Sequence, residues 1–366
     1  MRIDRISTEN FRLLEKQEVD FGEGVNVICG ANAQGKTSLL EAVYLLTGMK
    51  SFRTRFDKEL IAFDREDAIV SGALEACGRQ QKVELHFMRG RSRQIRVNGA
   101  ARKASELTES LTAVLFCPDD LQLVRGTASL RRRMMDSAIS QLRPGYRALL
   151  ADFTHVYENK TRILKDWREK PSLLEPLDEF NASLALYSAR LIRYRASFIR
   201  RLQEAAAPIH REFSGGGEEL ELSYETVSTV TDPEGSERQL YEEIMERQRQ
   251  LRQAELDAEL CLVGAHKDDM PIRINGVDAR SFASQGQTRT AALSLKLSER
   301  EIFLQETGES PVLLLDDVLS ELDSQRQEFV LNRIQGGQTL ITCCDEESVS
   351  HLTGGRVLRL EKGRVF

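Results

Sequence analysis

The stretch that decides the fold is Gly30-Ala31-Asn32-Ala33-Gln34-Gly35-Lys36-Thr37, which fits the pattern G-x-x-x-x-G-K-[ST]. An apolar run at 25–29 precedes it, and a helix-like segment at 38–46 follows it. This context is typical of a phosphate-binding loop, because the loop N–H groups and the helix N-terminus face the phosphates of a nucleotide. Lys36 is then expected to contact the β and γ phosphates, and Thr37 to offer its hydroxyl to Mg²⁺.

A second motif lies far downstream at 311–317, where the chain reads Pro-Val-Leu-Leu-Leu-Asp-Asp. The apolar residues predict a buried strand that ends in two carboxylates. In a parallel sheet such acids lie at the carboxyl edge, where ligands bind. We therefore expect Asp316 to hold Mg²⁺ through water, opposite Thr37. Asp317 is expected to polarise the water that attacks the nucleotide.

Composition describes an ordinary globular chain of 366 residues, with 41% hydrophobic and 30% charged content, long enough for two or three units. No apolar run reaches the length of a membrane span, and the first residues alternate like a strand, so a cytoplasmic protein without a membrane partner is expected. The six cysteines include no C-x-x-C pair and sit mostly in apolar runs. Reduced core thiols are therefore expected, and no metal other than Mg²⁺ is indicated.

Charge is distributed unevenly around the formal net value of −6. Residues 125–201 contain 16 Lys/Arg against 8 Asp/Glu, whereas residues 202–259 contain 5 against 15. A basic stretch beside a nucleotide site permits binding to a phosphate backbone. Charge alone leaves a solvated helical face as an equal alternative.

The segment between the two motifs is far longer than a compact nucleotide-binding core needs, which predicts a large insertion. Within it, apolar or aromatic residues recur by three and four from Leu177 to Phe198, which indicates a helix with a heptad seam. A similar pattern from Tyr146 to Trp167, interrupted by Lys160, predicts a second long helix packed antiparallel to the first. The arginines placed mostly off the seam and expected to be exposed are Arg190, Arg193, Arg195, Arg200 and Arg201.

The segments on either side of the insertion differ in pattern. Before it, residues 68–76, 82–88, 91–97 and 111–117 read as strands. After it, residues 284–305 read as a helix, and the strand that ends at Asp317, a helix at 324–334 and a strand at 338–343 follow. The alternation predicts an α/β fold with a parallel core.

Two further motifs reduce the number of α/β folds that fit the sequence. Ser284-Gln285-Gly286-Gln287 opens the helix at 284–305, and Ser320-Glu321-Leu322-Asp323 follows the acid pair. In this order they resemble the signature motif and D-loop of ATP-binding-cassette (ABC) ATPases, in which a helix N-terminus clamps a phosphate held by another subunit. In isolation, Ser284 would read as an ordinary helix N-cap.

More segments resemble the RecF family of bacterial recombination-repair ATPases, over essentially the full length. Those segments are Thr8-Glu9-Asn10-Phe11-Arg12, Val19-Asp20-Phe21, Ser51-Phe52-Arg53-Thr54, Leu115-Phe116-Cys117-Pro118-Asp119-Asp120-Leu121, Arg131-Arg132-Arg133 with Asp136, and Gly264-Ala265-His266-Lys267-Asp268-Asp269. The family resembles the heads of chromosome-maintenance ATPases but lacks their extended coiled coils and hook.

The resemblance implies an α/β P-loop NTPase of ABC type, with a mixed sheet (an antiparallel subdomain plus a parallel core) and an inserted helical, partly coiled-coil arm. The expected divisions are an ATPase lobe I at 1–124, the arm at 125–257 and an ATPase lobe II at 258–366. It also implies a homodimer induced by ATP, in which each nucleotide lies between the loop of one chain and the signature motif of the other. The implied nucleotide-binding residues are Gly30, Ala31, Asn32, Ala33, Gln34, Gly35, Lys36, Thr37 and Arg12, with Ser284, Gly286 and Gln287 from the partner; Lys36 and Asp317 are the implied catalytic residues.

Function and partners follow from the same resemblance. The family binds DNA, favours junctions between single-stranded gaps and duplex, and works with RecO and RecR to load RecA. A weak, DNA-stimulated ATPase that acts as a switch is implied. The strand at 311–317 corresponds to the Walker B motif of cassette ATPases, with Asp316 as its Asp. Most of these ATPases carry Glu at the next position, where this chain has the shorter Asp317, which predicts slow hydrolysis. Residues 118–120 take the place of the loop that couples nucleotide to the arm, and residues 342–345 stand where a γ-phosphate-sensing His is common.

Two alternatives stay open on the sequence. The energising subunit of an ABC transporter would share all the nucleotide motifs, but it would need a small helical insertion that docks a membrane partner. A chromosome-organising head would also share them, and the short arm without a hinge argues against it. Basic loops around Lys50, Arg53 and Arg55, and around Arg89 to Arg96, compete with the arm for DNA contacts.

Overall fold

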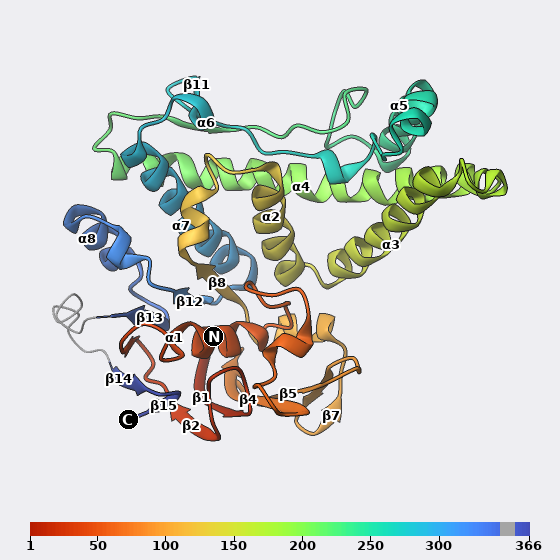
Figure 1. Ribbon diagram of the computed structural model, residues 1–366. Coiled ribbons are helices and arrows are strands. Elements are labelled where there is room, and N and C mark those ends of the chain that lie inside the picture. The colour runs from red at the N-terminus through yellow and green to blue at the C-terminus, as the bar shows by residue number, and fades with distance from the viewer. Residues whose placement is uncertain (345–355) are drawn as a thin grey trace. The chain divides into compact units, whose positions relative to one another are not determined.

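The protein divides into two compact units in the computed structural model, which describes residues 1–344 and 356–366 (Figure 1). Unit 1 comprises residues 1–122, 209–217 and 284–366, and unit 2 comprises residues 123–208 and 218–283. Residues 258–283, which the sequence placed with the second ATPase lobe, therefore lie in unit 2. Among the described residues, no helix is both long and apolar enough to cross a membrane.

An antiparallel sheet forms one layer of unit 1. Its long central strands alternate buried and exposed side chains, as expected for a sheet with one face on a core. In spatial order the strands are β2 (Gln17–Asp20), β1 (Arg2–Glu9), β4 (Asp67–Ala76), β5 (Arg79–Met88), β6 (Gln94–Val97) and β7 (Ala100–Ala101).

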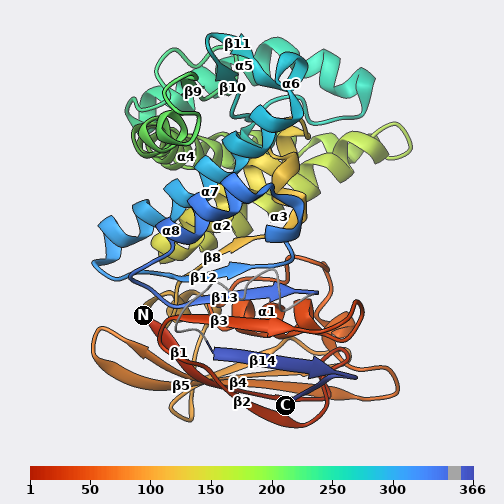
Figure 2. The ribbon, with the colours of Figure 1, turned by 90° about the vertical axis from the view of Figure 1, so that its left-hand side faces the viewer.

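A second sheet of unit 1 has a parallel core and carries the nucleotide motifs. Its spatial order is β15 (Arg364–Val365), β14 (Arg356–Glu361), β3 (Val25–Cys29), β13 (Thr339–Cys343), β12 (Val312–Leu315) and β8 (Ala113–Phe116). Figure 2 shows the five strands from β14 to β8 lying one above the other in this order. All neighbours from β14 to β8 pair in parallel. Register places Cys343 beside Cys29, and Leu315 beside both Ile341 and Phe116. The carboxyl ends of β3, β13, β12 and β8 therefore meet at one edge.

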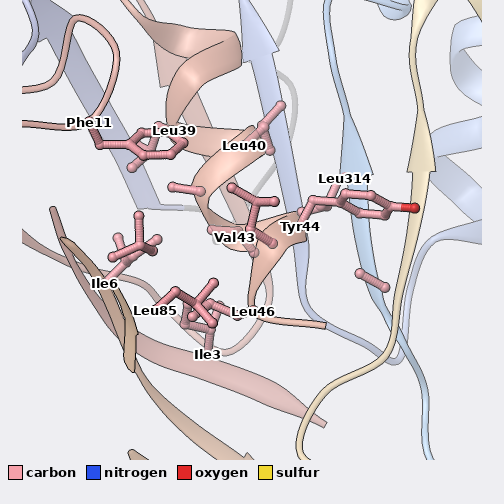
Figure 3. Packing of buried hydrophobic residues seen from close by; sticks show 14 of the residues in the cluster. Ile3, Ile6, Phe11, Leu39, Leu40, Val43, Tyr44, Leu46, Leu85 and Leu314 are labelled. Carbon is pink, nitrogen blue, oxygen red and sulfur yellow. The ribbon is translucent and has the colours of Figure 1, made fainter. Parts of the chain in front are cut away.

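Helix α1 (Lys36–Leu45) lies between the two sheets and is buried along almost its whole length. Figure 3 shows Leu39, Val43 and Leu46 packed among side chains of the antiparallel sheet, with Tyr44 beside Leu314 of β12. A Cβ added to Gly72 of β4 would lie 2.4 Å from the Leu46 side chain, so this close approach requires glycine. The core thus fixes the first helix, and with it the loop that precedes the helix.

Other helices of unit 1 carry the remaining motifs. Ser284 caps α7 (Gln285–Thr307), and Asp323 caps α8 (Ser324–Arg333). Helix α7 ends at Gly308, whose φ of 73° is the left-handed conformation favoured for glycine after a helix. The short 3₁₀ segments are η1 (Asp57–Leu60), η2 (Ala104–Glu109), η3 (Pro118–Gln122) and η6 (Leu319–Glu321).

Unit 2 is mainly helical. Its α-helices are α2 (Ala128–Leu142), α3 (Pro144–Asp166), α4 (Leu177–Phe213, whose last turns belong to unit 1), α5 (Glu237–Ala258) and α6 (Ala279–Phe282). Two 3₁₀ segments, η4 (Pro171–Leu174) and η5 (Ala265–Lys267), and a small sheet of β9 (Leu220–Leu222), β10 (Ile272–Ile274) and β11 (Val277–Asp278) complete it. The Tyr146 ring of α3 packs edge-on against the Tyr194 ring of α4 at 5.3 Å, as antiparallel packing of these helices predicts.

The expectation that Arg195 is exposed is wrong. Its side chain is only 2% exposed and donates to both carboxylate oxygens of Asp136, at 2.9 and 3.0 Å. A third bond, of 2.7 Å, reaches the fully buried Asp268, which also accepts bonds of 2.6 Å from Tyr224 and Thr226. The exposure of Arg195 could not be predicted correctly, because a heptad pattern identifies only the apolar positions of a helix and does not indicate a buried polar network.

The network continues along the segment at 264–269. Arg131 forms a two-pronged ion pair with Asp269, with bonds of 2.7 and 2.8 Å, and Arg132 donates to the Asp268 carbonyl at 2.5 Å. Lys160, which interrupts the apolar pattern of its helix, is likewise buried and lies 2.7 Å from Glu255. Buried ion pairs therefore tie the helices of unit 2 together.

Candidate nucleotide-binding site

Residues 30–37 form a tight loop between β3 and α1. The Gly30 N–H donates to the Cys343 carbonyl at 3.3 Å, and a Cβ at Gly30 would lie 2.3 Å from the Leu360 carbonyl oxygen. Gly35 adopts a φ of 107° at the N-cap of α1, where no side chain accepts from the first turn. The first N–H groups of this helix thus lack a side-chain cap, and they are the donors that bind an anion at a helix N-terminus.

Lys36 folds back over this loop. Its ammonium donates to the carbonyls of Gly30 at 2.7 Å and Ala31 at 3.3 Å, and lies 3.4 Å from the Cys344 sulfur. The residue is only 4% exposed. Within residues 1–344 and 356–366 this ammonium has carbonyl and thiol partners and no carboxylate partner, so it carries a positive charge that suits a phosphate.

Thr37 and Asp316 come together from opposite ends of the chain. The Thr37 hydroxyl donates to Asp316 Oδ1 at 2.9 Å. Thr342 donates to the same oxygen at 3.0 Å and accepts from the Asp317 N–H at 2.8 Å. Burial raises the pKa of Asp316, although the bonds from Thr37 and Thr342 oppose the shift. An oxygen pair of this kind, a hydroxyl beside a buried carboxylate, is the donor set that Mg²⁺ prefers.

Asp317 holds an unusual backbone and an unsatisfied oxygen. Its φ is 52°, in the left-handed region, and its carbonyl accepts from the Ser320 hydroxyl at 2.6 Å. Among the described residues, Asp317 Oδ1 is buried and has no hydrogen-bond partner. An orphaned carboxylate oxygen beside Asp316 fits a role in orienting water, since buried oxygens in proteins otherwise find donors.

Hydrogen bonds to other segments hold the loop at 30–37 in place. Gln34 accepts through its carbonyl from the Gly363 N–H at 3.1 Å and through its side chain from the Lys362 N–H at 2.5 Å. Asn32 accepts from the Cys344 thiol at 3.0 Å, and Ala33 has a φ of 62°. Sequence reasoning missed the support from the C-terminal turn, although its Lys-Gly pair was a turn signal.

Arg12 forms a two-pronged ion pair with Glu41, with bonds of 3.0 and 2.9 Å, and its predicted contact with phosphate stays a prediction. Glu41 is fully buried and also contacts Ser51 and, at 3.4 Å, Arg53. Sequence reasoning missed Glu41, whose only signal was a charge in an apolar helix. These residues join the N-terminal strand to α1 beside the loop.

The signature residues form a capping box. The Ser284 hydroxyl accepts from the Gln287 N–H at 3.2 Å, and the Gln287 side chain accepts from the Ser284 N–H at 2.8 Å. Arg326 of α8 donates to the Gly286 carbonyl at 3.2 Å and to Thr290 at 3.1 Å. The helix start is thereby fixed against the segment that follows the D-loop, while Ser284 itself stays exposed.

The loop at 118–120 acts electrostatically on buried charges of α7. Asp120 accepts from the Cys117 N–H at 2.9 Å and acts electrostatically on Lys296, which pairs with the buried Glu299. Burial alone would lower the pKa of Lys296, but Glu299 and Asp120 outweigh it and raise the pKa. Of the stretch at 342–345, Thr342 bonds to Asp316 and Asp317, and Asp345 lies outside the described residues.

Comparisons with known proteins agree with this geometry. Residues 2–362 match the RecF/RecN/SMC N terminal domain family. The DNA replication and repair protein RecF of Acetivibrio thermocellus is 37% identical, over 100% of both chains. A solved structure of the recombination mediator protein RecF with ATPrS, described in the RecFOR pathway, superposes with a TM-score of 0.92 at 36% identity and covers 100% of this chain and 97% of the other.

A second solved structure, of the same mediator protein with ATP, gives a TM-score of 0.89 at 35% identity and covers 100% of this chain and 96% of the other. Both of these matches cover the whole of this chain, and therefore both units. The chain belongs to the RecF/RecN/SMC N-terminal domain family and, within it, to the RecF proteins of DNA replication and repair.

Proposed function

We propose that this chain is an ATP-dependent DNA-binding protein of recombinational repair and replication-fork maintenance. The single observation that carries the proposal is the 2.9 Å bond between Thr37 and Asp316. It supports one nucleotide site to which residues 30–37 and the end of β12 would both contribute. Two solved RecF structures, one described with ATP and one with ATPrS, support ATP as the nucleotide. Residues 30–37 would bind its phosphates, with Lys36 as the cation that contacts them.

Mg²⁺ would be held by Thr37 and Asp316. When bound there, the ion would supply charge neutralisation for the phosphates. Asp317 would orient the attacking water through its orphaned Oδ1, and Thr342 would hold the Asp317 backbone in place. A short carboxylate on a strained backbone supports slow hydrolysis, so that ATP acts as a switch and DNA stimulates a weak ATPase.

ATP would induce a homodimer. The exposed position of Ser284 at the start of α7 supports this, because within one chain the signature residues bond to each other and leave the face of the helix N-terminus toward solvent. Ser284, Gly286 and Gln287 of one chain would then face the nucleotide held by the other. Arg12, which pairs with Glu41 of α1, would be a further phosphate contact.

Dimerisation can be tested by sedimentation velocity with and without ATP. Ser284→Arg is expected to bind ATP normally and to stay monomeric, because the bulky cation blocks the facing surface. Arg289→Ala, which removes an exposed contact with Glu321 one turn further along α7, serves as the control and is expected to dimerise. A Ser284→Arg protein that dimerises with ATP would remove the sandwich from the proposal.

DNA is the proposed partner, both single-stranded and duplex, with RecO and RecR as protein partners and RecA loading as the outcome, in the cytoplasm. The test is the affinity for gapped duplex with ATP, ADP or no nucleotide, over a salt series. A nucleotide-dependent affinity whose logarithm falls linearly with the logarithm of salt concentration is expected, and the slope estimates the number of phosphates engaged. Binding to gapped duplex that is the same with ATP, with ADP and without nucleotide would contradict the proposed switch.

A further inference from the structure

Two phenylalanines of unit 1 stand out because they project into solvent. Phe63 is 90% exposed and Phe56 is 58% exposed. A single exposed apolar residue is ordinary on a protein surface. These two lie in the short segment 50–66, which is also rich in arginine and lysine. Their setting therefore indicates more than incidental exposure.

The backbone holds Phe63 at the tip of a fixed turn. The Ala62 N–H donates to the Asn10 carbonyl at 2.8 Å, and the Arg65 N–H closes the turn on the Ala62 carbonyl at 3.2 Å. Asp64 takes the left-handed conformation, with a φ of 62°. Because both sides of the turn are tied to the antiparallel sheet, the ring is presented to solvent by a rigid element.

A second loop brings more positive charge to the same place. Arg89 donates from its backbone to the Glu66 carbonyl at 3.1 Å and from its side chain to the Arg65 carbonyl at 2.8 Å. Arg93 of this loop donates to the carbonyls of Gly48 and Met49 at 2.9 and 3.0 Å. Residues 48–66 and 89–93 thus form one surface, which we call the basic–aromatic surface.

The charge of this surface is opposite in sign to that of the whole chain. It contains eight Lys/Arg and four Asp/Glu, whereas the chain has a net charge of −6. Arg55, Arg65 and Arg91 are exposed, and within residues 1–344 and 356–366 none of them forms an ion pair. Lys58 lies 5.5 Å from the Phe56 ring centroid. Uncompensated cations beside flat aromatic rings match a chain of phosphates and bases.

We propose that the basic–aromatic surface receives unpaired nucleotides at the junction of single-stranded and duplex DNA. Phe63 and Phe56 stack on the unpaired bases, while Arg55, Arg65 and Arg91 contact the phosphates. Bases inside a duplex already stack on one another, so an aromatic side chain finds a free base face only where a strand is unpaired. This inference rests on the DNA binding proposed above and assigns it to named residues.

A lipid surface is the competing partner for exposed phenylalanines and cations. It is less favoured because membrane-surface elements bury a broad apolar face, and here two rings alternate with Asp57, Asp64 and Glu66. The bases of a single strand need only one ring each, and the phosphates between them need separated cations. The spacing of rings and arginines therefore favours nucleic acid.

The first experiment compares gapped duplex with blunt duplex of the same sequence by fluorescence anisotropy, in the presence of ATP. Phe63→Ala is expected to weaken binding to gapped duplex on the order of tenfold and to leave blunt duplex within about twofold, because stacking is lost only at unpaired bases. Phe366→Ala, which removes a phenylalanine that is 76% exposed, is the matched control and is expected to change neither affinity. Arg65→Ala is expected to weaken both and to reduce the salt slope by about 1.

A second variant reports stacking directly. The chain contains one Trp, so Phe63→Trp adds a single new emitter whose spectrum is obtained by subtracting that of the parent protein. Quenching of this emission by an oligothymidylate supports the inference, and unquenched emission at saturating oligonucleotide contradicts it.

The outcomes separate this inference from the function on which it rests. If the parent protein binds gapped duplex and Phe63→Ala binds equally well, the surface assignment fails and the DNA-binding function stands. Equal losses on gapped and blunt duplex also defeat it, because stacking would then not select unpaired bases. Absence of DNA binding by the parent protein ends both proposals. Co-sedimentation with phosphatidylglycerol vesicles that Phe63→Ala abolishes would assign the surface to lipid instead.

Discussion

Two regions of this molecule bury charge, and they do so in different ways. In unit 2, Arg195 and Asp268 lie in a network in which the carboxylate and the guanidinium are hydrogen-bonded on several sides. At the carboxyl edge of the parallel sheet in unit 1, Lys36 has only carbonyl and thiol partners, and Asp317 Oδ1 has none among the described residues. A satisfied network stabilises one arrangement of helices, whereas an incomplete one leaves capacity for a ligand.

The largest expected effect on stability concerns the hydrogen-bonded network of unit 2. Arg195→Ala should lower the free energy of unfolding by about 3–5 kcal/mol, because it leaves Asp136 and Asp268 without their cation. Urea denaturation followed by circular dichroism measures it. Arg200→Ala on the same helix is the control. Its partner Glu234 is exposed, so this change should cost far less than Arg195→Ala. Equal losses for the two variants would remove the contrast between the regions.

Lys36→Met should weaken nucleotide binding and leave the stability of the fold nearly unchanged. Nucleotide binding should weaken by about 2–3 kcal/mol, because a charge-assisted contact to phosphate is lost. The free energy of unfolding should change by less than about 1 kcal/mol, because the ammonium has no ion-pair partner within residues 1–344 and 356–366 to leave behind. Titration with a fluorescent ATP analogue and urea denaturation give the two numbers. A variant that binds ATP normally would contradict the assignment of the loop.

Acid should act on unit 2 through His266. Burial lowers the pKa of His266 to about 4, its Nε2 lies 3.0 Å from the Cys261 carbonyl, and its Nδ1 has no partner among the described residues. Because the pKa is lower in the folded state, the unfolded chain takes up the proton first, and stability is lost as pH falls from about 6.5 towards 4.

Between pH 7 and pH 5 this group should cost about 2 kcal/mol of unfolding free energy. His266→Gln should lose less over the same interval than the parent protein, and the difference between the two is the contribution of the imidazole. His155→Gln, at an exposed position, should keep the parent's pH dependence. A parent protein and a His266→Gln variant with parallel curves would show that His266 does not titrate in this range.

The smallest expected effect is an increase in the free energy of unfolding. Asp317→Gly should raise the free energy of unfolding by about 1 kcal/mol, because it removes a left-handed backbone strain and a buried oxygen without a donor. Its ATPase activity should fall at the same time. Asp268→Asn in unit 2 makes a parallel change at a satisfied aspartate and should destabilise. If Asp317→Gly and Asp268→Asn both destabilise the protein, then Asp317 contributes to stability as Asp268 does, and the contrast between the two regions fails.

Sequence patterns predicted the elements of unit 1 closely. Helices expected at 284–305 and 324–334 are found at Gln285–Thr307 and Ser324–Arg333, and the strand expected at 338–343 is Thr339–Cys343. Caps and turn residues set these ends, and they act over a few residues only. The strand expected at 91–97 begins later, at Gln94, because residues 89–93 form the loop that Arg93 ties to Gly48 and Met49.

The mixed α/β fold of a RecF-type ATPase was therefore predictable, and so was the meeting of Thr37 with Asp316. Thr342, Glu41 and the turn at 362–363 were not, although each contacts a motif residue. A hydroxyl or a carboxylate at such a position looks ordinary in sequence, since its role depends on which strand lies beside it.

What the sequence determined by itself is local: a glycine loop that must begin a helix, an apolar strand that must end in acids, and the order in which a known family arranges them. These features follow from backbone sterics and from the spacing of apolar residues, which act between near neighbours. The tertiary structure alone decided which charges are neutralised, burying Arg195 among carboxylates and leaving Asp317 Oδ1 without a donor. The reason is that desolvation and pairing depend on distances between segments far apart in the chain, and no local pattern records them.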